Sequence, residues 1–415
     1  MKAGADMGAA RRTPSTAKTE TPKSIEKIRP GAFLQLFLAT LGFGVNFWAW
    51  ALISPLGPTY KAELSLTPFQ QSRVVAIPVL VGSLGRIPVG GLTDRFGARV
   101  MFPAVSFLTV LPVLFVGFYG TSLTRLVLGG FFLGLGGTAF AVGVPFVNAW
   151  FPPSRRGLAI GIFGVGMGGT AVSAFTTVKL VEAHSLSFPF TLVAGVLIAY
   201  GVIAWLFIRE SPARTVGTGA FWARTWTTMK MKPTLQLSFL YAVGFGGFVA
   251  FSVYLPTYLQ TWYGLEKADA ASRTAGFVVL AVIARPIGGW LSDRFHPVPV
   301  LVGCFSALAV LALVVSLHIN LIPYPTIAFL SMAAVLGAAA GAVFALVARV
   351  APADKVGSVT GVVGAAGGLG GFIPPLIMGV VYSVTGNYSL GYVLLALVAA
   401  GAALYTWTAM RTEGR

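Results

Sequence analysis

Charged side chains are scarce in this chain of 415 residues. Asp, Glu, Lys and Arg make up only 10% of it, and just 12 residues are acidic, whereas soluble domains carry roughly 25% charged residues. Hydrophobic residues reach 56%, and the mean hydropathy is +0.82. Because so few charges cannot solubilise a surface of this size, a string of soluble domains is excluded. The 51 glycines and 25 prolines suit membrane helices better than barrel strands, so we predict an all-α integral membrane protein.

Cysteine and histidine are almost absent too. Cys304 is the single cysteine and lies in an apolar run, so no disulfide can form within the chain and a structural role fits it. The three histidines, His184, His296 and His318, fall at the ends of apolar runs. Neither a Cys/His cluster nor a Gly-x-x-x-x-Gly-Lys-Ser/Thr motif is present, so we expect no metal, nucleotide or other cofactor. An enzyme is disfavoured because no acidic residue or histidine lies mid-span to carry chemistry.

The basic residues are unevenly placed. The formal net charge of +17 could indicate a nucleic-acid partner, but 21 of the 29 Lys and Arg residues fall in the chain ends and in loops between even- and odd-numbered apolar runs. Such loops share one side of a membrane, and a basic excess marks the cytoplasmic side. We therefore expect no nucleic-acid partner, a multi-pass protein of the cytoplasmic (inner) membrane, and cytoplasmic termini. Residues 1–30 lack the apolar core of a signal peptide and are predicted to form a cytoplasmic basic tail.

Twelve apolar runs follow the tail, each long enough for a membrane helix, which needs about 20 residues. They fall near 31–56, 70–91, 98–119, 122–149, 157–181, 188–208, 234–262, 270–292, 298–318, 321–348, 357–384 and 388–410. A polar, basic stretch separates the sixth run from the seventh. The predicted organisation is a six-helix bundle over 31–208, a cytoplasmic linker over 209–233 and a second six-helix bundle over 234–411.

The two halves of the chain repeat one another. The second run ends Arg86-Ile-Pro-Val-Gly90-Gly-Leu-Thr-Asp94-Arg95-Phe96, and the eighth ends Arg285-Pro-Ile-Gly-Gly289-Trp-Leu-Ser-Asp293-Arg294-Phe295. The matching Arg, Gly, Asp, Arg and Phe positions all differ by 199. Corresponding segments in two six-helix halves indicate a transporter built from repeats.

Arg86 and Arg285 are the most informative residues in the chain. Each precedes its loop aspartate by eight residues, which places it about 12 Å up the helix, near the middle of a hydrocarbon core about 30 Å thick. An Arg there costs roughly 2.5–3.5 kcal/mol, and all 12 acidic residues fall in tails, loops or helix ends. The pair therefore implies an anionic ligand in a central cavity between the halves. The alternative is that both snorkel to the interface or bind backbone carbonyls.

Aromatic residues could complete an anion site. A guanidinium is planar and binds oxyanions bidentately, which suits a small flat anion. Tyr241 and Phe245 share a helix face, so they could offer a hydroxyl donor and a ring to sandwich such an anion. Phe140 is a similar candidate, although aromatic stripes in membrane helices more often pack or face lipid. Arg73 and Arg125 lie nearer the outer helix ends and fit a vestibule or structural role.

Both copies of the repeat lead into a charged loop. The first copy continues as Gly90-x-x-x-Asp94-Arg95-x-Gly97-x-Arg99 and resembles the signature of the major facilitator superfamily. The second keeps Gly289, Asp293 and Arg294 and then departs from the pattern at His296-Pro297. Gly90 permits close helix approach, and Asp94 can cap a neighbouring helix or pair with an Arg across the interface. We interpret both copies as a cytoplasmic gate latch; a solvated charged turn is the alternative.

Two glycine-rich runs occupy corresponding places in the halves. Their glycines at the small-residue spacing of close helix contacts are Gly164, Gly166 and Gly168 in the fifth run, and Gly364, Gly367, Gly368 and Gly371 in the eleventh. We expect them to allow helix packing and motion. Tight packing alone is the alternative.

The eleventh run, with Gly341-Ala-Val-Phe344 and Val356-Gly357-Ser-Val-Thr-Gly361 before it, resembles the nitrate/nitrite porter family of the major facilitator superfamily. The resemblance covers about 35–410. It implies the major facilitator fold, with 12 transmembrane helices in two pseudo-symmetric bundles. It also implies that Arg86 and Arg285 hold the anion and that Tyr241, Phe245 and Phe140 orient it. Met167 stands where the family often has an asparagine, so one polar substrate contact is missing.

The expected function is secondary transport of nitrate, nitrite or both by alternating access in a monomer embedded in the lipid bilayer. Coupling is either nitrate/nitrite exchange or uptake with protons as a further partner. Exchange is favoured because no mid-span carboxylate can relay a proton. The alternatives are a major facilitator transporter for another small anion, such as cyanate or an organic acid, and a non-transporting membrane sensor.

Overall fold

The computed structural model describes residues 28–214, 216, 221–371 and 373–410. Within those residues every regular element is a helix, and twelve segments are long and apolar enough to span a membrane. The twelve-helix prediction is therefore confirmed. Most of the expected basic tail (1–27) and part of the expected linker (215 and 217–220) lie outside the described residues.

Ten α-helices and four 3-10 turns build the first half. They are α1 (Ala32–Trp50), η1 (Ser54–Leu56), α2 (Gly57–Glu63), α3 (Pro68–Leu84), α4 (Arg86–Phe96), α5 (Ala98–Tyr119), α6 (Leu123–Leu133), η2 (Gly134–Thr138), α7 (Ala139–Trp150), η3 (Pro153–Arg155), α8 (Arg156–Gly164), η4 (Val165–Gly168), α9 (Gly169–Ala183) and α10 (Phe188–Phe207). The short helix α11 (Phe221–Met229) follows in the stretch predicted as linker.

Within its described residues, the second half has seven helices. They are α12 (Lys232–Tyr263), α13 (Lys267–Phe295), α14 (Pro297–Ser316), α15 (Tyr324–Val350), α16 (Val356–Gly370), α17 (Ile373–Thr385) and α18 (Ser389–Ala409). Several ends carry local signals: Thr67 and Gln70 form a capping box on α3, and Gly264 ends α12 in the left-handed conformation that glycine adopts at least cost.

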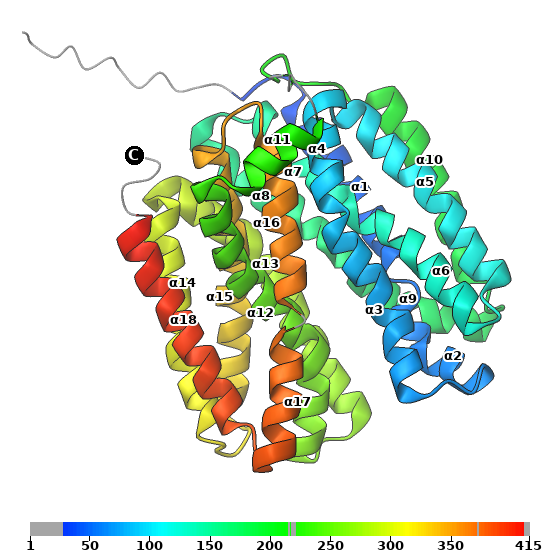
Figure 1. Cartoon of the computed structure of the whole chain (residues 1–415), viewed down its shortest axis with the longest axis vertical. Coiled ribbons are helices and arrows are strands. Elements are labelled where there is room, and N and C mark those ends of the chain that lie inside the picture. The colour runs from blue at the N-terminus through cyan, green and yellow to red at the C-terminus, as the bar shows by residue number, and fades with distance from the viewer. Residues whose placement is uncertain (1–27, 215, 217–220, 372, 411–415) are drawn as a thin grey trace, which may run out of the picture.

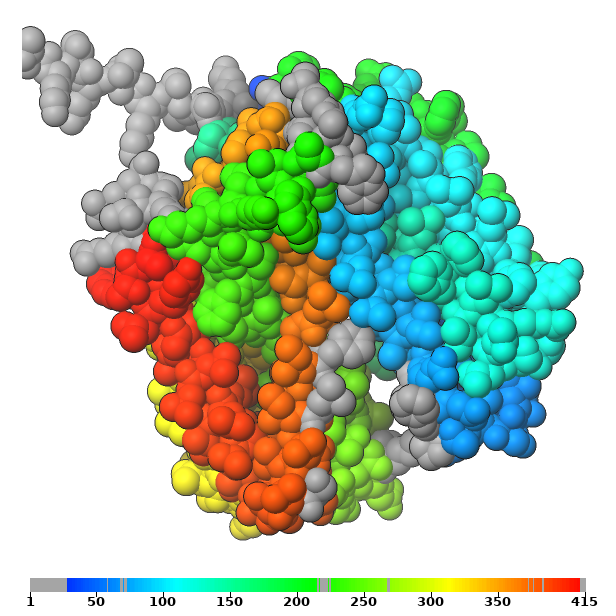
Figure 2. All heavy atoms as spheres, viewed as in Figure 1, coloured from blue at the N-terminus to red at the C-terminus, as the bar shows by residue number. Residues whose placement is uncertain are grey.

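The two halves form two bundles that lie side by side (Figure 1). Both ends of the described chain lie at the same end of the molecule, where α11 also crosses between the bundles. We call this end the termini face and the opposite end the distal face. Near the termini face the bundles are in contact through α4 with α16 and α8 with α13. Toward the distal face they stand apart, and the surface is hollowed between the α2–α3 region and the second bundle (Figure 2).

Four of the predicted continuous helices are interrupted. The second span breaks at Gly85 between α3 and α4, the fourth passes through η2, the fifth passes through η4, and the eleventh breaks between α16 and α17. Glycine lies at or beside each break and weakens a helix because it gains the most conformational freedom when the helix opens. Gly85 directly precedes Arg86, η2 contains Gly137, which contacts Arg86, and η4 contains Met167, which contacts Arg285. Three of the interruptions therefore lie at the two arginines.

Candidate anion site and gate

The two mid-membrane arginines lie on opposite bundles and reach across the interface. Arg86 is the first residue of α4, and Arg285 lies within α13. Each is only 2% exposed. The side chain of Arg86 contacts α16 of the second bundle, and that of Arg285 contacts η4 of the first. The two positive charges therefore meet at the plane where the bundles join.

Arg86 is anchored by backbone carbonyl groups. Its Nε donates to the carbonyl oxygen of Gly137 at 3.1 Å, and its Nη1 donates to that of Gly364 at 2.9 Å. Carbonyl binding was the alternative interpretation of the two buried arginines, and the structure shows it for Arg86. These two bonds use two of the five N–H donors of a guanidinium, so donors remain for a ligand.

Arg285 is anchored by side chains instead. Its Nη1 donates to the Met167 sulfur at 3.0 Å, and its Nη2 donates to the Tyr241 hydroxyl oxygen at 3.1 Å. Met167 therefore supplies a thioether acceptor to the arginine. Because the Tyr241 oxygen accepts from Arg285, its own hydroxyl hydrogen can point to another acceptor.

One aromatic ring lies beside both arginines. The guanidinium carbon of Arg86 is 5.5 Å from the ring centroid of Phe140, and that of Arg285 is 5.3 Å from it. Both distances are within the range of a cation–π attraction, which gains strength when the cation is desolvated. The negative face of the ring thus offsets part of the charge that no carboxylate neutralises.

The neighbouring rings form a cage around this point. Tyr241 is parallel to Phe140, with centroids 6.5 Å apart and planes 5° apart, and Phe344 packs edge-on against both, at 4.8 and 4.7 Å. Phe245 stacks directly on Tyr241 at 4.9 Å, so a planar anion cannot lie between those two. The region between the parallel rings of Phe140 and Tyr241, whose centroids are 6.5 Å apart, is here called the ring slot.

Phe344 was missed as a site residue. It is fully buried, and an aromatic residue in an apolar run carries no signal of its own. Its only indication in the sequence was its place in the segment that carries the family resemblance.

Several glycines leave room for the site side chains. A Cβ added at Gly164 would lie 2.4 Å from Arg285 Nε, and one added at Gly367 would lie 2.2 Å from Tyr241. At Gly364 the nearest atom would be Arg86 Cδ at 3.2 Å. These three glycines therefore make space for the arginines and the tyrosine.

The remaining predicted glycines of these runs do not share one environment. A Cβ at Gly368 would clash with Ser83, one at Gly371 with Val249 and one at Gly166 with Phe43. Gly168 has nothing within 4 Å of its added Cβ. Packing therefore requires glycine at the first three positions but not at Gly168.

The two aspartates that were predicted to lie in loops are in the last turns of α4 and α13, and each caps a helix of the opposite bundle. Asp94 accepts from Gly357 N at 2.7 Å and from Ser358 N and Oγ at 2.8 and 2.6 Å, at the start of α16. Asp293 accepts from Gly157 N and Leu158 N, both at 2.8 Å, at the start of α8. A carboxylate at a helix N-terminus satisfies unpaired N–H groups and complements the helix dipole.

The backbones pack closely beside these caps. A Cβ added at Gly289 would lie 2.0 Å from the Gly157 carbonyl oxygen, and one at Gly90 would lie 2.2 Å from that of Gly357. We call the two aspartate caps with these two glycine contacts the termini-side gate. In this structure these contacts join the two bundles at the termini face.

Arg95 and Arg294 lie beside the gate but contact rings of their own helices. Arg95 lies over Phe96 at 5.4 Å, and Arg294 lies over Trp290 and Phe295 at 5.8 and 5.4 Å. Among the hydrogen bonds described above, those that join the two bundles at the gate are accepted by Asp94 and Asp293.

Comparison with known proteins identifies the family. The sequence model of the Major Facilitator Superfamily matches residues 39–375 and, separately, 274–414. The probable nitrate/nitrite transporter NarK2 of Mycobacterium tuberculosis is 48% identical over 91% of this chain and 96% of its own. The nitrite extrusion protein of Bacillus subtilis is 35% identical over 88% of this chain and 91% of its own. The chain belongs to the nitrate/nitrite porter family of the major facilitator superfamily.

The solved structures agree on the fold. The crystal structure of the major facilitator transporter FucP in the outward conformation matches this porter with a TM-score of 0.75, over 92% of this chain and 100% of that one, at 18% identity. That likeness supports the fold class predicted from the sequence. These comparisons match the porter to transporters, in agreement with the expectation that it is not an enzyme.

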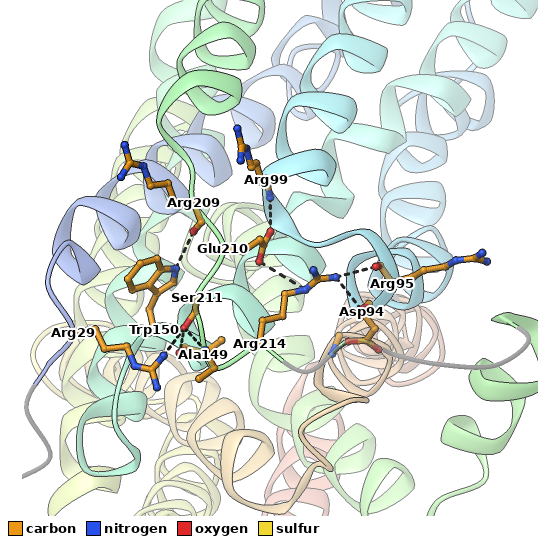
Figure 3. A network of polar contacts seen from close by, with 12 residues as sticks. Arg29, Asp94, Arg95, Arg99, Ala149, Trp150, Arg209, Glu210, Ser211 and Arg214 are labelled. Atoms are coloured by element: carbon orange, nitrogen blue, oxygen red, sulfur yellow. Dashed lines mark hydrogen bonds and ion pairs between the residues drawn. The ribbon is translucent and has the colours of Figure 1, made fainter.

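The chain that follows α10 is tied to the end of α4, which carries Asp94, and to the start of α5 (Figure 3). Glu210 Oε1 accepts from the backbone N–H of Arg99 at 2.8 Å. Arg214 Nη2 donates to the carbonyl oxygens of Asp94 and Arg95 at 3.1 and 2.9 Å. The start of the predicted linker thus braces one half of the termini-side gate.

The outer arginines lie at exposed positions. Arg125 donates to Thr121 Oγ1 near the start of its own helix, and Arg73 lies exposed on α3.

Proposed function

We propose that this porter is a secondary transporter that moves nitrate and nitrite across the membrane by alternating access. The observation that carries the proposal is the meeting of Arg86 and Arg285 at Phe140, in the plane between two repeated bundles. The names of the two relatives, a nitrate/nitrite transporter and a nitrite extrusion protein, support these anions over cyanate or an organic acid.

The anion would lie in the ring slot. Nitrate is flat, so the faces of Phe140 and Tyr241 can contact it while the guanidinium groups donate in its plane. Charge-assisted bonds from an arginine are worth about 1.5–3 kcal/mol each. The Tyr241 hydroxyl supplies a further donor, since its oxygen already accepts from Arg285.

Alternating access would use the termini-side gate. With the gate closed and the distal side hollowed, the structure corresponds to a state that opens toward the distal face. Release to the other side requires α16 to leave Asp94 and α8 to leave Asp293. The rocking of two repeats around a fixed central site is the general form of such transport.

We infer exchange of nitrate for nitrite as the coupling mode. An empty site carries two buried positive charges, and one bound monoanion halves that net charge. Closing the protein on both sides of the empty site is therefore costlier than closing it around a bound anion. Asp94 and Asp293 are at helix ends and are held by backbone N–H groups, so neither is placed to relay a proton through the centre.

We also propose that the termini face is cytoplasmic, on the basic excess of the loops at that face, in a cytoplasmic membrane. A reporter fused after Arg415 that is active only in the cytoplasm is the expected result. Activity of a periplasmic reporter at the same position would reverse the orientation.

Exchange in proteoliposomes tests the function. Labelled nitrate should enter vesicles loaded with nitrite, unlabelled nitrate and nitrite should compete, and cyanate or acetate should not. Equal competition by cyanate would assign the site to a broader class of small anions.

A further inference from the structure

A polar cavity lies on the termini face. Its volume is about 220 Å³, and its walls include Asn148 of α7, Arg156 of α8, Arg214 after α10 and Arg349 of α15, together with Asp94 and Glu210. Figure 3 shows Arg214 between Glu210 and the end of α4 that carries Asp94 and Arg95. A water molecule takes roughly 30 Å³ in the liquid, so the cavity has room for a small hydrated anion.

The charge of the cavity walls is positive. Three arginines face two carboxylates, and both carboxylates already accept hydrogen bonds. Asp94 caps α16, and Glu210 accepts from the Arg99 backbone and lies 3.7 Å from Arg214 Nε.

Two of the arginines keep donors for a ligand. Arg214 is bound through Nη2 and lies near Glu210 through Nε. Arg349 donates through Nη2 to the Ser292 carbonyl oxygen at 3.2 Å. A guanidinium has five N–H donors, so these contacts do not exhaust either group.

Asn148 supplies an independent sign of a ligand. Its side chain is only 8% exposed, lies on the cavity wall, and has an amide oxygen without a hydrogen-bond partner among the described residues. Buried polar atoms are nearly always satisfied. Because the amide can turn to present its NH₂ group instead, Asn148 can donate to an anion in the cavity.

We propose that this cavity binds a small oxyanion and that occupancy holds the termini-side gate closed. The walls come from both bundles, so the complete site exists only while the bundles are in contact at this face. A ligand that binds one state alone shifts the population toward it. Inorganic phosphate and the transported anion share the required chemistry. Anion binding here is independent of the proposed function, whereas its effect on transport rests on it.

Thermal unfolding of the purified full-length porter tests binding without any transport assay. Sodium phosphate, compared with sodium chloride at equal ionic strength, should raise Tm saturably by about 2 °C at ten times Kd. The same titration with nitrate is done in Arg285→Gln, where the central site is disabled. A rise in Tm there shows that the transported anion also binds in the termini-face cavity. Asn148→Leu should abolish the rise, and Asn148→Asp, which keeps the volume and adds a negative charge, should do the same if the leucine variant fails to fold.

Gln236→Leu is the matched control. Gln236 is also a buried amide without a partner among the described residues, at 3% exposure, but it lies on α12 away from this cavity. The control should keep the rise in Tm. An equal rise in Asn148→Asp would reveal a general salt effect and overturn the proposal, as would no rise with either anion.

Transport then tests the regulatory part. Phosphate on the termini side should slow nitrate exchange several-fold in the wild type but not in Asn148→Asp. An unchanged exchange rate in a protein whose Tm responds to phosphate would leave a binding site and reject control of the gate.

Discussion

At the scale of single residues, the two buried arginines are equivalent by sequence repeat but not by environment. Arg86 is held by two backbone carbonyls, whereas Arg285 is held by a thioether and a phenol. A sulfur is a weak acceptor, so Arg285 loses less when it turns toward an incoming anion. We therefore expect Arg285 to move more than Arg86 when the site fills.

Replacing either arginine by lysine tests the planar fork. Arg86→Lys and Arg285→Lys keep the charge but lose bidentate binding, and the loss of one charge-assisted bond corresponds to about 10- to 100-fold slower nitrate uptake at low substrate. Arg125→Lys, near the distal end of α6, is the matched control and should transport normally. Near-normal uptake by both site variants, with protein levels unchanged, would show that charge alone suffices or that the anion binds elsewhere.

The two arginines of the candidate site could be predicted from the sequence, but the groups that anchor them could not. An arginine in a long apolar run is costly, so Arg86 and Arg285 were recognisable from the sequence. Their partners were not, because Gly137 contributes a backbone carbonyl, which every residue has. Met167 looked like a missing polar contact, and only three-dimensional placement reveals that its sulfur contacts Arg285.

At the scale of elements, the gate depends on helices that approach almost backbone to backbone. Between α13 and α8, Gly289 and Gly157 leave no room for a side chain. The same relation holds between Gly90 on α4 and Gly357 on α16. The aspartate caps then fix the register of each pair, because a carboxylate bonds only to the first turn of the helix it meets.

Adding one methyl group tests this closure. Gly289→Ala places a Cβ about 2 Å from a backbone oxygen, which cannot be relieved by a rotamer change, and overpacking of this kind costs roughly 1–3 kcal/mol. We expect the closed gate to be destabilised and nitrate exchange to fall about tenfold. Gly168→Ala, where the added Cβ meets nothing within 4 Å, is the control and should keep wild-type exchange. Equal loss in both variants would remove the gate from the explanation.

The sequence predicted where the spans lie but not where they break. Apolar runs report burial in lipid, and glycine within such a run is compatible with either a continuous helix or an opened one. The helix breaks at Gly85 and at η2 are therefore seen only in the structure. Helix α11 was also missed, since its nine residues lie in a polar stretch and are too short for a clear periodic pattern.

At the scale of the whole molecule, the repeat explains both the site and the gate. Each bundle contributes one arginine to the centre and one aspartate to the opposite bundle, and each lends a glycine-rich helix to its partner. The matched positions Gly157 and Gly357, and Gly164 and Gly364, lie at the equivalent contacts. The duplicated sequence thus predicted the symmetry, whereas the conformational state required the structure.

Counterflow tests the central claim most directly. It measures whether the site of Arg86 and Arg285 must hold an anion before the two bundles can change from one state to the other. Labelled nitrate is offered to proteoliposomes that contain nitrite, nitrate or no permeant anion, with and without an imposed pH gradient. Obligatory exchange predicts rapid entry into vesicles loaded with either anion and almost none into anion-free vesicles. Robust uptake into anion-free vesicles driven by the pH gradient would contradict exchange and make this porter a proton-coupled nitrate importer.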